Sequence, residues 1–187
     1  VKECINFLIK PENANLRLLE LTIELAAHML QLSGIESDLE TARVKSQDAL
    51  TSGKAAAIFE QMISALGGPS DLLEKSHKHL VPMPIIRPIA ANSSGYVLEM
   101  DARAIGLSMI HLKAGRTKSS DPIDHGVGLS DIVEIGQWID KGEPLAIAHT
   151  RDKEQLSYLQ ETIPGFISLG AKHIEPPTLI HEILGSN

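Results

Sequence analysis

A chain of 187 residues can form one domain or two small ones, and 43% hydrophobic with 22% charged residues is ordinary for a globular protein. The net charge of −7 argues against a general nucleic-acid surface, because phosphate binding needs an excess of Lys and Arg. The single cysteine, Cys4, excludes an intramolecular disulfide framework. It suits a reducing cytosol, and no apolar run approaches the roughly 20 residues of a membrane-spanning helix. We therefore expect a cytoplasmic protein with neither a nucleic-acid nor a membrane partner.

The first eighty residues have the patterns of consecutive helices. A first helix ends at Ile9, before Pro11. From Leu16 to Leu32 polar residues recur every three or four positions among apolar ones, which predicts a largely buried helix with a narrow polar stripe. Such helices should pack on one another or on a partner. Further helices are predicted from a capping box at Ser37–Glu40 to about Leu50, from Lys54 to Leu66, and in a short segment capped by Ser70.

The prolines between residues 82 and 88 mark the one convincing domain junction. Proline fixes a backbone torsion and removes an amide donor, so this stretch reads as an extended connector. We therefore predict a helical domain over residues 1–80 and a second domain over residues 81–187. The first residues read as the middle of an amphipathic helix and contain no initiating Met, so the chain is expected to begin inside a larger protein.

The second domain combines short strands, glycine turns and one inserted helix. Strands are predicted at 87–91 and 96–100, and Asp101 is placed to cap a helix from Ala102 to Leu112. Further strands lie between Ile132 and Ala148 and at 166–169. This pattern predicts an α+β chain whose second domain is a small twisted barrel or sandwich. A charged helix over 151–162, a coil over 176–179 and a short C-terminal helix after that coil complete the prediction.

Few residues form a convincing catalytic group. His125 beside Asp124, with Asp121 nearby, could act as a base with its orienting carboxylate. Adjacent residues on an extended segment usually point apart, so we favour a polar loop rim. The histidines do not have zinc-ligand spacing. A basic loop over 113–121 carries Lys113, Arg116 and Lys118, which could meet an anion or close over a cleft, although the residues alone favour a solvated loop.

Several motifs together give the sequence a family resemblance. The chain resembles the C-terminal part of the thymidine phosphorylase and pyrimidine-nucleoside phosphorylase family, over essentially its whole length. The motifs that carry this resemblance are Val1-Lys-Glu-Cys, Gly53-Lys-Ala, Gly67-Gly-Pro, Tyr96-Val-x-x-x-Asp101-Ala-Arg-Ala-Ile-Gly-Leu, Ala114-Gly-Arg, Ser120-Asp-Pro-Ile-Asp-His-Gly-Val-Gly-Leu129, Gly142-Glu-Pro-Leu-Ala-Ile and Pro177-Thr-Leu-Ile-His-Glu.

The resemblance implies a fold and a reaction. Residues 1–80 would be the helical end of a catalytic domain, and the rest a barrel-sandwich, α/β-hammerhead-like domain. Family members use phosphate to release the pyrimidine from a deoxynucleoside, which yields 2-deoxyribose 1-phosphate and needs no organic cofactor. The family's phosphate motif, Lys-x-Ser-x-Gly-Gly-x-Gly-Asp, does not occur in these 187 residues. The resemblance thus implies that this chain holds no catalytic residue of its own and is inactive alone.

The resemblance also assigns roles to individual residues. The basic loop would close the substrate cleft, through Lys113, Arg116, Lys118, Asp121 and His125. Glu3 matches a family carboxylate that helps to bind a monovalent cation near the phosphate loop. The intact protein would be a homodimer that binds nucleoside and phosphate, whereas this chain is expected to be mainly monomeric. Its preference for thymidine over uridine stays open, because the base-binding residues lie outside the matched motifs.

Three alternatives stay open beside that reading. The pattern Gly136-x-x-Ile-x-x-Gly142-x-x-Leu145 is similar to the turns of biotinyl and lipoyl carriers. Carriers need a lysine at a hairpin tip, and the comparable turn, Glu99–Asp101, has none. A non-catalytic interaction module is the second alternative. An anthranilate phosphoribosyltransferase-like protein is the third, and the barrel segment argues against it.

Overall fold

The computed structural model describes residues 1–184 and separates into two compact units. Of the described residues, the helical unit comprises 1–80 and 178–184, and the sheet unit comprises Val81–Pro177. Within residues 1–184, none of the helices has both the length and the apolar character needed to cross a bilayer. Each unit is described by itself below.

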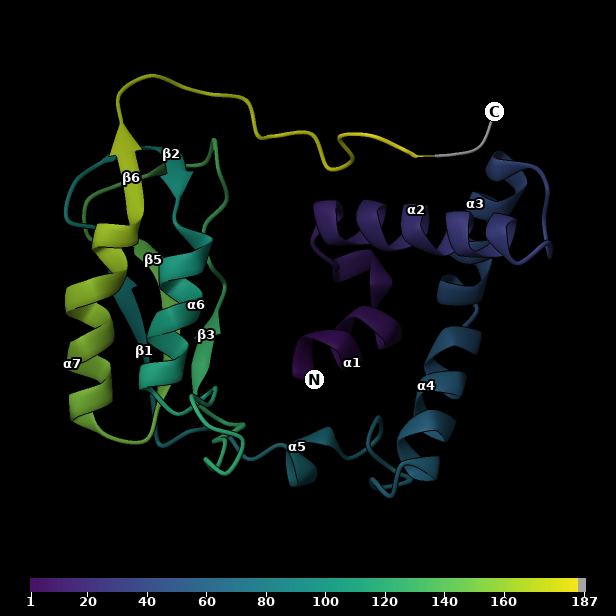
Figure 1. The fold of residues 1–187 in the computed structure, drawn as a ribbon, viewed down its shortest axis with the longest axis horizontal. Helices are drawn as coiled ribbons and strands as arrows, with labels where there is room; N and C mark the ends of the chain where they lie inside the picture. Colours follow the sequence, from purple (N-terminus) through teal and green to yellow (C-terminus); the bar gives the residue numbers. More distant parts are fainter. Residues whose placement is uncertain (185–187) are drawn as a thin grey trace. The chain divides into compact units, whose positions relative to one another are not determined.

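The helical unit follows the predicted order of helices. Helix α2 covers Leu16–Leu32 as predicted, and the side chain of Asn15 caps it by accepting a hydrogen bond from the Leu18 amide at 3.1 Å. The other helices are α1 (Lys2–Ile9), the 3-10 turn η1 (Pro11–Asn13), α3 (Leu39–Thr51), α4 (Lys54–Ala65) and α5 (Ser76–His79) (Figure 1).

Two predicted helix starts in this unit are wrong. Helix α3 is capped by Asp38 rather than by a box at Ser37, because the Asp38 carboxylate accepts both the amide and the hydroxyl of Thr41, at 2.8 and 2.7 Å. Asp is as good an N-cap as Ser, so the pattern alone could not separate neighbouring candidates. The short fifth helix begins at Ser76 and not after Ser70. The turn before it is held by Asp71, which contacts Lys75 and His79 at 3.0 and 2.7 Å.

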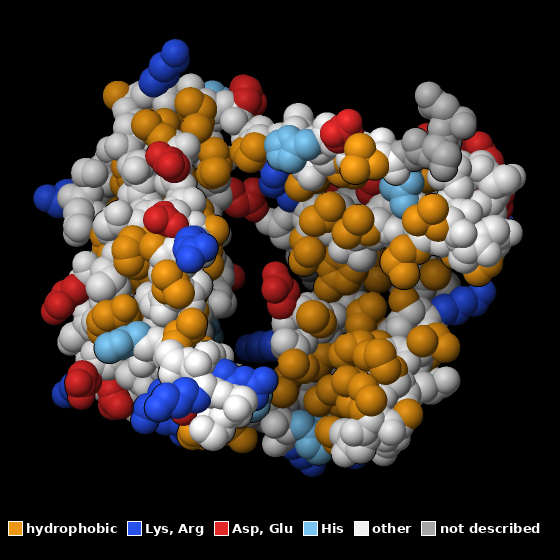
Figure 2. All heavy atoms as spheres, viewed as in Figure 1, with side chains coloured by type: hydrophobic (Ala, Val, Ile, Leu, Met, Phe, Trp, Pro, Cys, Tyr) orange, Lys and Arg blue, Asp and Glu red, His pale blue; other side chains and the backbone are white. Residues whose placement is uncertain are grey.

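The prediction that α2 is largely buried is also wrong. Ala27 is the buried residue of this helix, whereas Leu25, Met29 and Leu32 are exposed. Helix α2 packs against α3, where Glu24 and Arg43 form a bidentate ion pair with both N–O distances at 2.6 Å. Figure 2 shows hydrophobic side chains gathered on the visible face of the helical unit. The described residues of this unit therefore cover one side of α2 and leave apolar side chains on another.

The sheet unit contains two antiparallel three-stranded sheets. One sheet has the strand order β1-β5-β3 and the other β4-β2-β6, with one inserted helix, α6, between β2 and β3 (Figure 1). The element bounds are β1 Ile85–Ala90, β2 Gly95–Met100, α6 Ala102–His111, β3 Gly128–Ser130, β4 Trp138–Ile139, β5 Pro144–Thr150, α7 Lys153–Thr162, the 3-10 turn η2 Ile163–Phe166 and β6 Ile167–Gly170.

Strand β1 begins earlier than the predicted connector allows. It pairs with β5 from Ile85 opposite Thr150 to Ile89 opposite Ala146, so the extended connector is limited to residues 82–84. Pro88 is tolerated inside β1 because β1 is the edge strand of its sheet, where a missing amide costs no ladder bond. The predicted strand at 96–100, the helix after Asp101 and the strand before residue 170 are confirmed.

One contiguous core fills the sheet unit. Leu112, Leu145 and Leu159, from the end of α6, from β5 and from α7, are fully or almost fully buried in it. Ile89 of β1 and Val97 of β2 join them at 0% exposure, so both sheets contribute to the same cluster. The chain is therefore a mixture of helix and sheet, as predicted. The predicted C-terminal helix is absent from residues 178–184, which are irregular.

Candidate functional site

The basic loop lies within the segment that joins α6 to β3, residues 113–127, here called the α6–β3 loop. Helix α6 begins with its predicted cap, where Asp101 Oδ1 accepts the Ala104 amide at 2.8 Å. It ends at His111, the buried Leu112 follows as its C-cap, and Lys113 then turns the chain with a left-handed φ of 66°. Two amides close this turn, from Lys113 to the Ile110 carbonyl and from Ala114 to that of Met109. The loop thus leaves a helix end that is fixed by the core.

The base of the loop is closed by bonds between its two ends and α7. The Asp124 amide donates to the Lys113 carbonyl at 2.7 Å. The Arg151 guanidinium, just before α7, donates to both carboxylate oxygens of Asp124, with Nη2 at 2.9 Å from Oδ1. Gln155 donates to the Leu112 carbonyl at 3.3 Å and accepts the Arg151 amide at 2.9 Å. The loop ends, α6 and α7 therefore form one bonded group.

A second carboxylate shapes the loop from inside. Asp121 Oδ2 accepts the amides of Thr117 and Lys118 at 3.2 and 2.9 Å, and the Thr117 hydroxyl at 2.9 Å. The Asp121 amide returns a bond to the Lys118 carbonyl. This arrangement makes a tight turn at the loop tip, residues 116–120, and presents the side chains of Arg116 and Lys118 outward, where both are exposed.

Both carboxylates are held in their charged form. The pKa of Asp124 is below its usual value, chiefly because Arg151 donates to it, with the Gly126 amide adding to the effect against some desolvation. The pKa of Asp121 is lowered mainly by the Lys118 amide and then by the Thr117 hydroxyl. Neither group is thus suited to give a proton near neutral pH, and both act as hydrogen-bond acceptors that order the loop.

The structure places the predicted loop residues in different roles. The Arg116 and Lys118 side chains are exposed at the tip, and the ion pairs among the described residues do not include them. His125 is exposed at the base, and the carboxylate beside it is occupied by Arg151 rather than by the imidazole. Figure 2 shows Lys and Arg side chains gathered at the end of the sheet unit where this loop lies. Arg151 and Gln155 were not expected from the sequence, because both read as surface positions of a charged helix.

Glu3 stands in the other unit. It lies in the first turn of α1 with an exposed side chain. Across residues 1–184, no three His, Cys, Asp or Glu side chains are grouped as metal ligands. The predicted monovalent-cation role of Glu3 therefore gains no ligand set from the described residues and stays a prediction.

A second polar contact, between β3 and β5, was also missed by the sequence patterns. The Ser130 hydroxyl lies 2.8 Å from His149 Nε2 and donates to Asp131 at 2.8 Å. Asp131 has a left-handed φ of 49°, which allows it to face back to its neighbour. Because the hydroxyl already donates to a carboxylate, the imidazole is placed as its donor and not as a base that could remove its proton. This group is a structural contact rather than a nucleophile.

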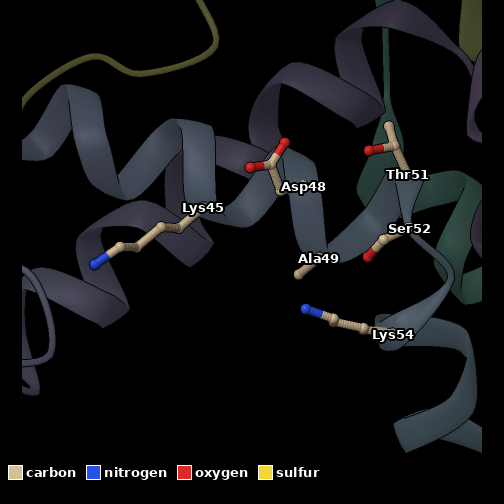
Figure 3. A pocket seen from close by; sticks show the side chains of 6 residues that line it. All are labelled: Lys45, Asp48, Ala49, Thr51, Ser52 and Lys54. Atoms are coloured by element: carbon tan, nitrogen blue, oxygen red, sulfur yellow. The ribbon is translucent and has the colours of Figure 1, made fainter.

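The helical unit has an open hollow where α3 meets α4. Figure 3 shows its lining side chains, Lys45, Asp48, Ala49, Thr51, Ser52 and Lys54, which lie along the second half of α3 and at the start of α4. Lys45 is paired with Glu36, and the Thr51 hydroxyl donates to the Gln47 carbonyl. Two of its polar side chains are engaged elsewhere and Asp48 lies among its lysines, so the hollow offers no defined chemistry.

Known proteins are similar to this chain at two levels, over part of the sheet unit and over most of the chain. Residues 96–169 match the sequence model of the family described as "Pyrimidine nucleoside phosphorylase C-terminal domain". A thymidine phosphorylase of Burkholderia orbicola (strain MC0-3) is 43% identical over 167 residues, and those of Burkholderia cenocepacia (strain HI2424) and Burkholderia lata are 42% and 39% identical. Each alignment covers 89% of this chain and 38% of the relative.

The chain is thus similar to the C-terminal part of proteins of the pyrimidine-nucleoside phosphorylase family. Within it, the relatives named above are all called thymidine phosphorylases, and the matched region, from β2 to β6, contains the whole α6–β3 loop. The chain spans 38% of the length of these relatives. The match alone therefore does not assign their complete activity to these 187 residues.

Proposed function

We propose that this sequence is part of a thymidine phosphorylase, which exchanges phosphate for thymine in the reversible reaction that yields 2-deoxyribose 1-phosphate. The observation that carries the proposal is the 43% identity to a thymidine phosphorylase over 89% of the chain. Phosphate is the co-substrate, and no organic cofactor is required. The enzyme would act as a cytoplasmic homodimer in pyrimidine-nucleoside salvage, and the exposed free thiol of Cys4 is compatible with a reducing compartment.

Within this enzyme, the chain would supply cleft closure rather than bond breaking. The sequence lacks the family's glycine-rich phosphate motif. The α6–β3 loop instead carries Arg116 and Lys118, exposed at the tip of a base that is bonded to α6 and α7. Such a loop can fold over a bound anionic substrate and exclude water from it. We also infer that the two sheets with the inserted α6 form a barrel-sandwich, hammerhead-like domain.

Phosphorolysis followed by ultraviolet absorbance tests this proposal. The purified 187-residue chain should release no thymine from thymidine, with or without phosphate. A protein that joins this sequence to the upstream part of a Burkholderia thymidine phosphorylase should release thymine only when phosphate is present. Failure of that joined, folded protein to turn over any pyrimidine nucleoside would refute the proposed function. Turnover by the chain alone would instead place the chemistry among its own residues, with Arg116, Lys118 and His125 as the first to test.

A carrier function is the second candidate, and one observation favours it. Lys141 is exposed in the tight turn between β4 and β5, where its amide donates to Ser94 Oγ at 2.8 Å. Carrier domains attach their group to a lysine in such a turn. The turn at Glu99–Asp101 cannot serve, because Asp101 caps α6. Mass spectrometry after co-expression with biotin and lipoyl ligases would show a mass increase on Lys141 if the chain were a carrier, and no added mass would exclude it.

A further inference from the structure

The α6–β3 loop is tied at its base by one bidentate ion pair. Arg151 lies between β5 and α7, so its backbone is fixed by a buried strand on one side and a helix on the other. Asp124 lies near the far end of the loop and receives two guanidinium N–H donors, while its Oδ1 also accepts the Gly126 amide at 3.1 Å. Two parallel donors define the orientation of a carboxylate as well as its distance.

The exposure of the two side chains indicates what this pair contributes. The Asp124 side chain is 16% exposed and that of Arg151 is 58% exposed. A pair with one partner so open to water adds little to overall stability. Its fork geometry nevertheless selects one position for the end of the loop. The contribution is therefore mainly to the placement of the loop and only slightly to the stability of the fold.

The remaining bonds at the loop base run through the same two residues. The Asp124 amide closes the loop onto the Lys113 carbonyl, and Gln155 joins the Arg151 amide to the Leu112 carbonyl. The tip cations, Arg116 and Lys118, make no comparable contact with described residues. An ordered base with a free cationic tip is the arrangement expected of a loop that waits for an anionic ligand.

We propose that Asp124 and Arg151 are positioning residues whose bidentate pair pre-orders the α6–β3 loop, so that Arg116 and Lys118 meet a phosphate-bearing substrate without a further cost in loop ordering. This inference rests on the proposed phosphorylase function, which supplies the anion. Loss of the pair leaves the chemistry unchanged and reduces the fraction of molecules with a competent loop. The apparent affinity then falls by that fraction.

Two substitutions and one matched control test the pair. Arg151→Lys keeps the positive charge and removes the fork, and Asp124→Asn keeps an oxygen for the Gly126 amide and removes the charge. Because Arg151 is more than half exposed, Arg151→Lys should not unfold the unit. Arg43→Lys is the control, since Arg43 makes the same kind of bidentate contact with Glu24 in the helical unit.

Limited trypsin digestion of the 187-residue chain measures loop order directly. Trypsin cuts after Arg116 and Lys118, and mass spectrometry follows the two cuts separately. We expect Arg151→Lys and Asp124→Asn to speed both cuts roughly three- to tenfold, and Arg43→Lys to leave them unchanged. Cleavage rates equal to those of the unaltered chain in both loop variants would overturn the proposal.

Steady-state kinetics of the joined phosphorylase separate a positioning role from a merely structural one. Arg151→Lys should raise the KM for phosphate in inverse proportion to the competent loop fraction that remains, with kcat changed less than about twofold. In an Arg116→Ala/Lys118→Ala background the same substitution should have no further effect on KM, because the positioned cations are gone. A faster cleavage with an unchanged KM would overturn the positioning role. Absence of all phosphorolysis in the unaltered joined protein would refute the proposed function instead, and the digestion result would still decide whether the pair orders the loop.

Discussion

The helical unit and the sheet unit of this chain differ in where their apolar side chains lie. In the sheet unit, Leu112, Leu145 and Leu159 are fully or almost fully buried in a cluster to which both sheets contribute. In the helical unit, α2 buries Ala27 and exposes Leu25 and Met29. The helices of the helical unit therefore depend more on local devices, namely caps and ion pairs, whereas the sheet unit has a core that its own described residues complete.

This difference shows that a correct helix prediction does not imply a correct burial prediction. Periodicity identifies an apolar face, and the face exists in α2 whether or not another element covers it. A sheet unit that closes its own core gives its periodic residues their partners within the same hundred residues. In α2 the described residues leave part of that face exposed.

The largest expected effect comes from leucine truncation in the two units. Leu159→Ala removes a fully buried side chain from α7 and should lower the free energy of unfolding of the sheet unit by about 2–5 kcal/mol. Leu25→Ala removes a side chain that is 55% exposed on α2 and should change stability by less than about 0.5 kcal/mol. Both variants keep a helix-forming residue, so propensity does not explain the difference.

Two probes separate the units in this measurement. Trp138, the single tryptophan of the sequence, lies in β4, so its fluorescence reports on the sheet unit during urea denaturation. Far-ultraviolet circular dichroism is dominated by the helices and reports mainly on the helical unit. A Leu25→Ala loss as large as that of Leu159→Ala would show that the α2 face is covered in solution and would remove the contrast.

Two glycines with similar torsions give the next largest effect. Gly53 and Gly136 have φ of 78° and 87°, in the left-handed region. A Cβ on Gly53 would meet no atom within 4 Å, whereas one on Gly136 would lie 2.7 Å from the Ile174 carbonyl oxygen. Gly53→Ala should therefore cost about 1 kcal/mol from the torsion alone. Gly136→Ala should cost about 2–4 kcal/mol, because backbone must also move. Equal losses of unfolding free energy for the two variants would mean that the segment around Ile174 moves aside at little energetic cost.

Much of the fold could be predicted, because many of the signals are local. Asp101 marks the start of α6, and Pro11 marks the end of α1. The bounds of α2 follow from the spacing of its polar residues. The failures concern choices between equivalent neighbours, such as Asp38 against Ser37, and the position of β1, where Pro88 argued for a connector. An edge strand can hold a proline, and edge position is a property of the sheet that residues far along the chain decide.

The candidate site was predictable only in part, for the same reason. A run of basic residues marks the loop, and its tip cations, Arg116 and Lys118, are exposed as a loop of that composition suggests. The role of Asp124 was not visible, because its partner Arg151 lies 27 residues away in the sequence. The adjacent His125 was the nearer candidate and is not the group that the carboxylate contacts. Whether two side chains so far apart in the sequence can pair depends on where the end of β5 places Arg151 in the fold.

Removal of a helix cap should lower the stability of the two units by similar amounts. The difference between the units should therefore be confined to side-chain burial. Asp101→Ala removes the acceptor of the Ala104 amide in the sheet unit, and Asp38→Ala removes that of the Thr41 amide in the helical unit. Each should cost about 1 kcal/mol, because a capping bond depends on the first turn of the helix and little on the core. Urea denaturation with the two probes measures both. A cost at Asp101 well above that at Asp38 would show that the sheet unit depends on α6 beyond its capping bond.

The smallest expected effect is the part of each unit's acid dependence that comes from its bidentate ion pair. The pKa of Glu24 is lowered chiefly by the hydrogen bonds from Arg43, and that of Asp124 by those from Arg151. A carboxyl with a depressed folded pKa stabilises the fold above its unfolded pKa, and that stabilisation is lost as the pH falls through the folded value. Both units should thus lose stability below about pH 4, where carboxyls begin to take up protons.

Removing one charge should reduce this acid dependence in one unit and leave the other unchanged. Glu24→Gln should flatten the pH dependence of the circular dichroism transition below about pH 4, and Asp124→Asn that of the Trp138 transition. Both changes should be modest and weaken in high salt, since the two arginines are 31% and 58% exposed. The Asp124 effect should be the weaker of the two, because Arg151 is the more exposed partner. A pH dependence that either substitution alters in both transitions at once would mean that the units unfold as one. The contrast between a sheet unit with a closed core and a helical unit with exposed apolar side chains would then not describe their stability.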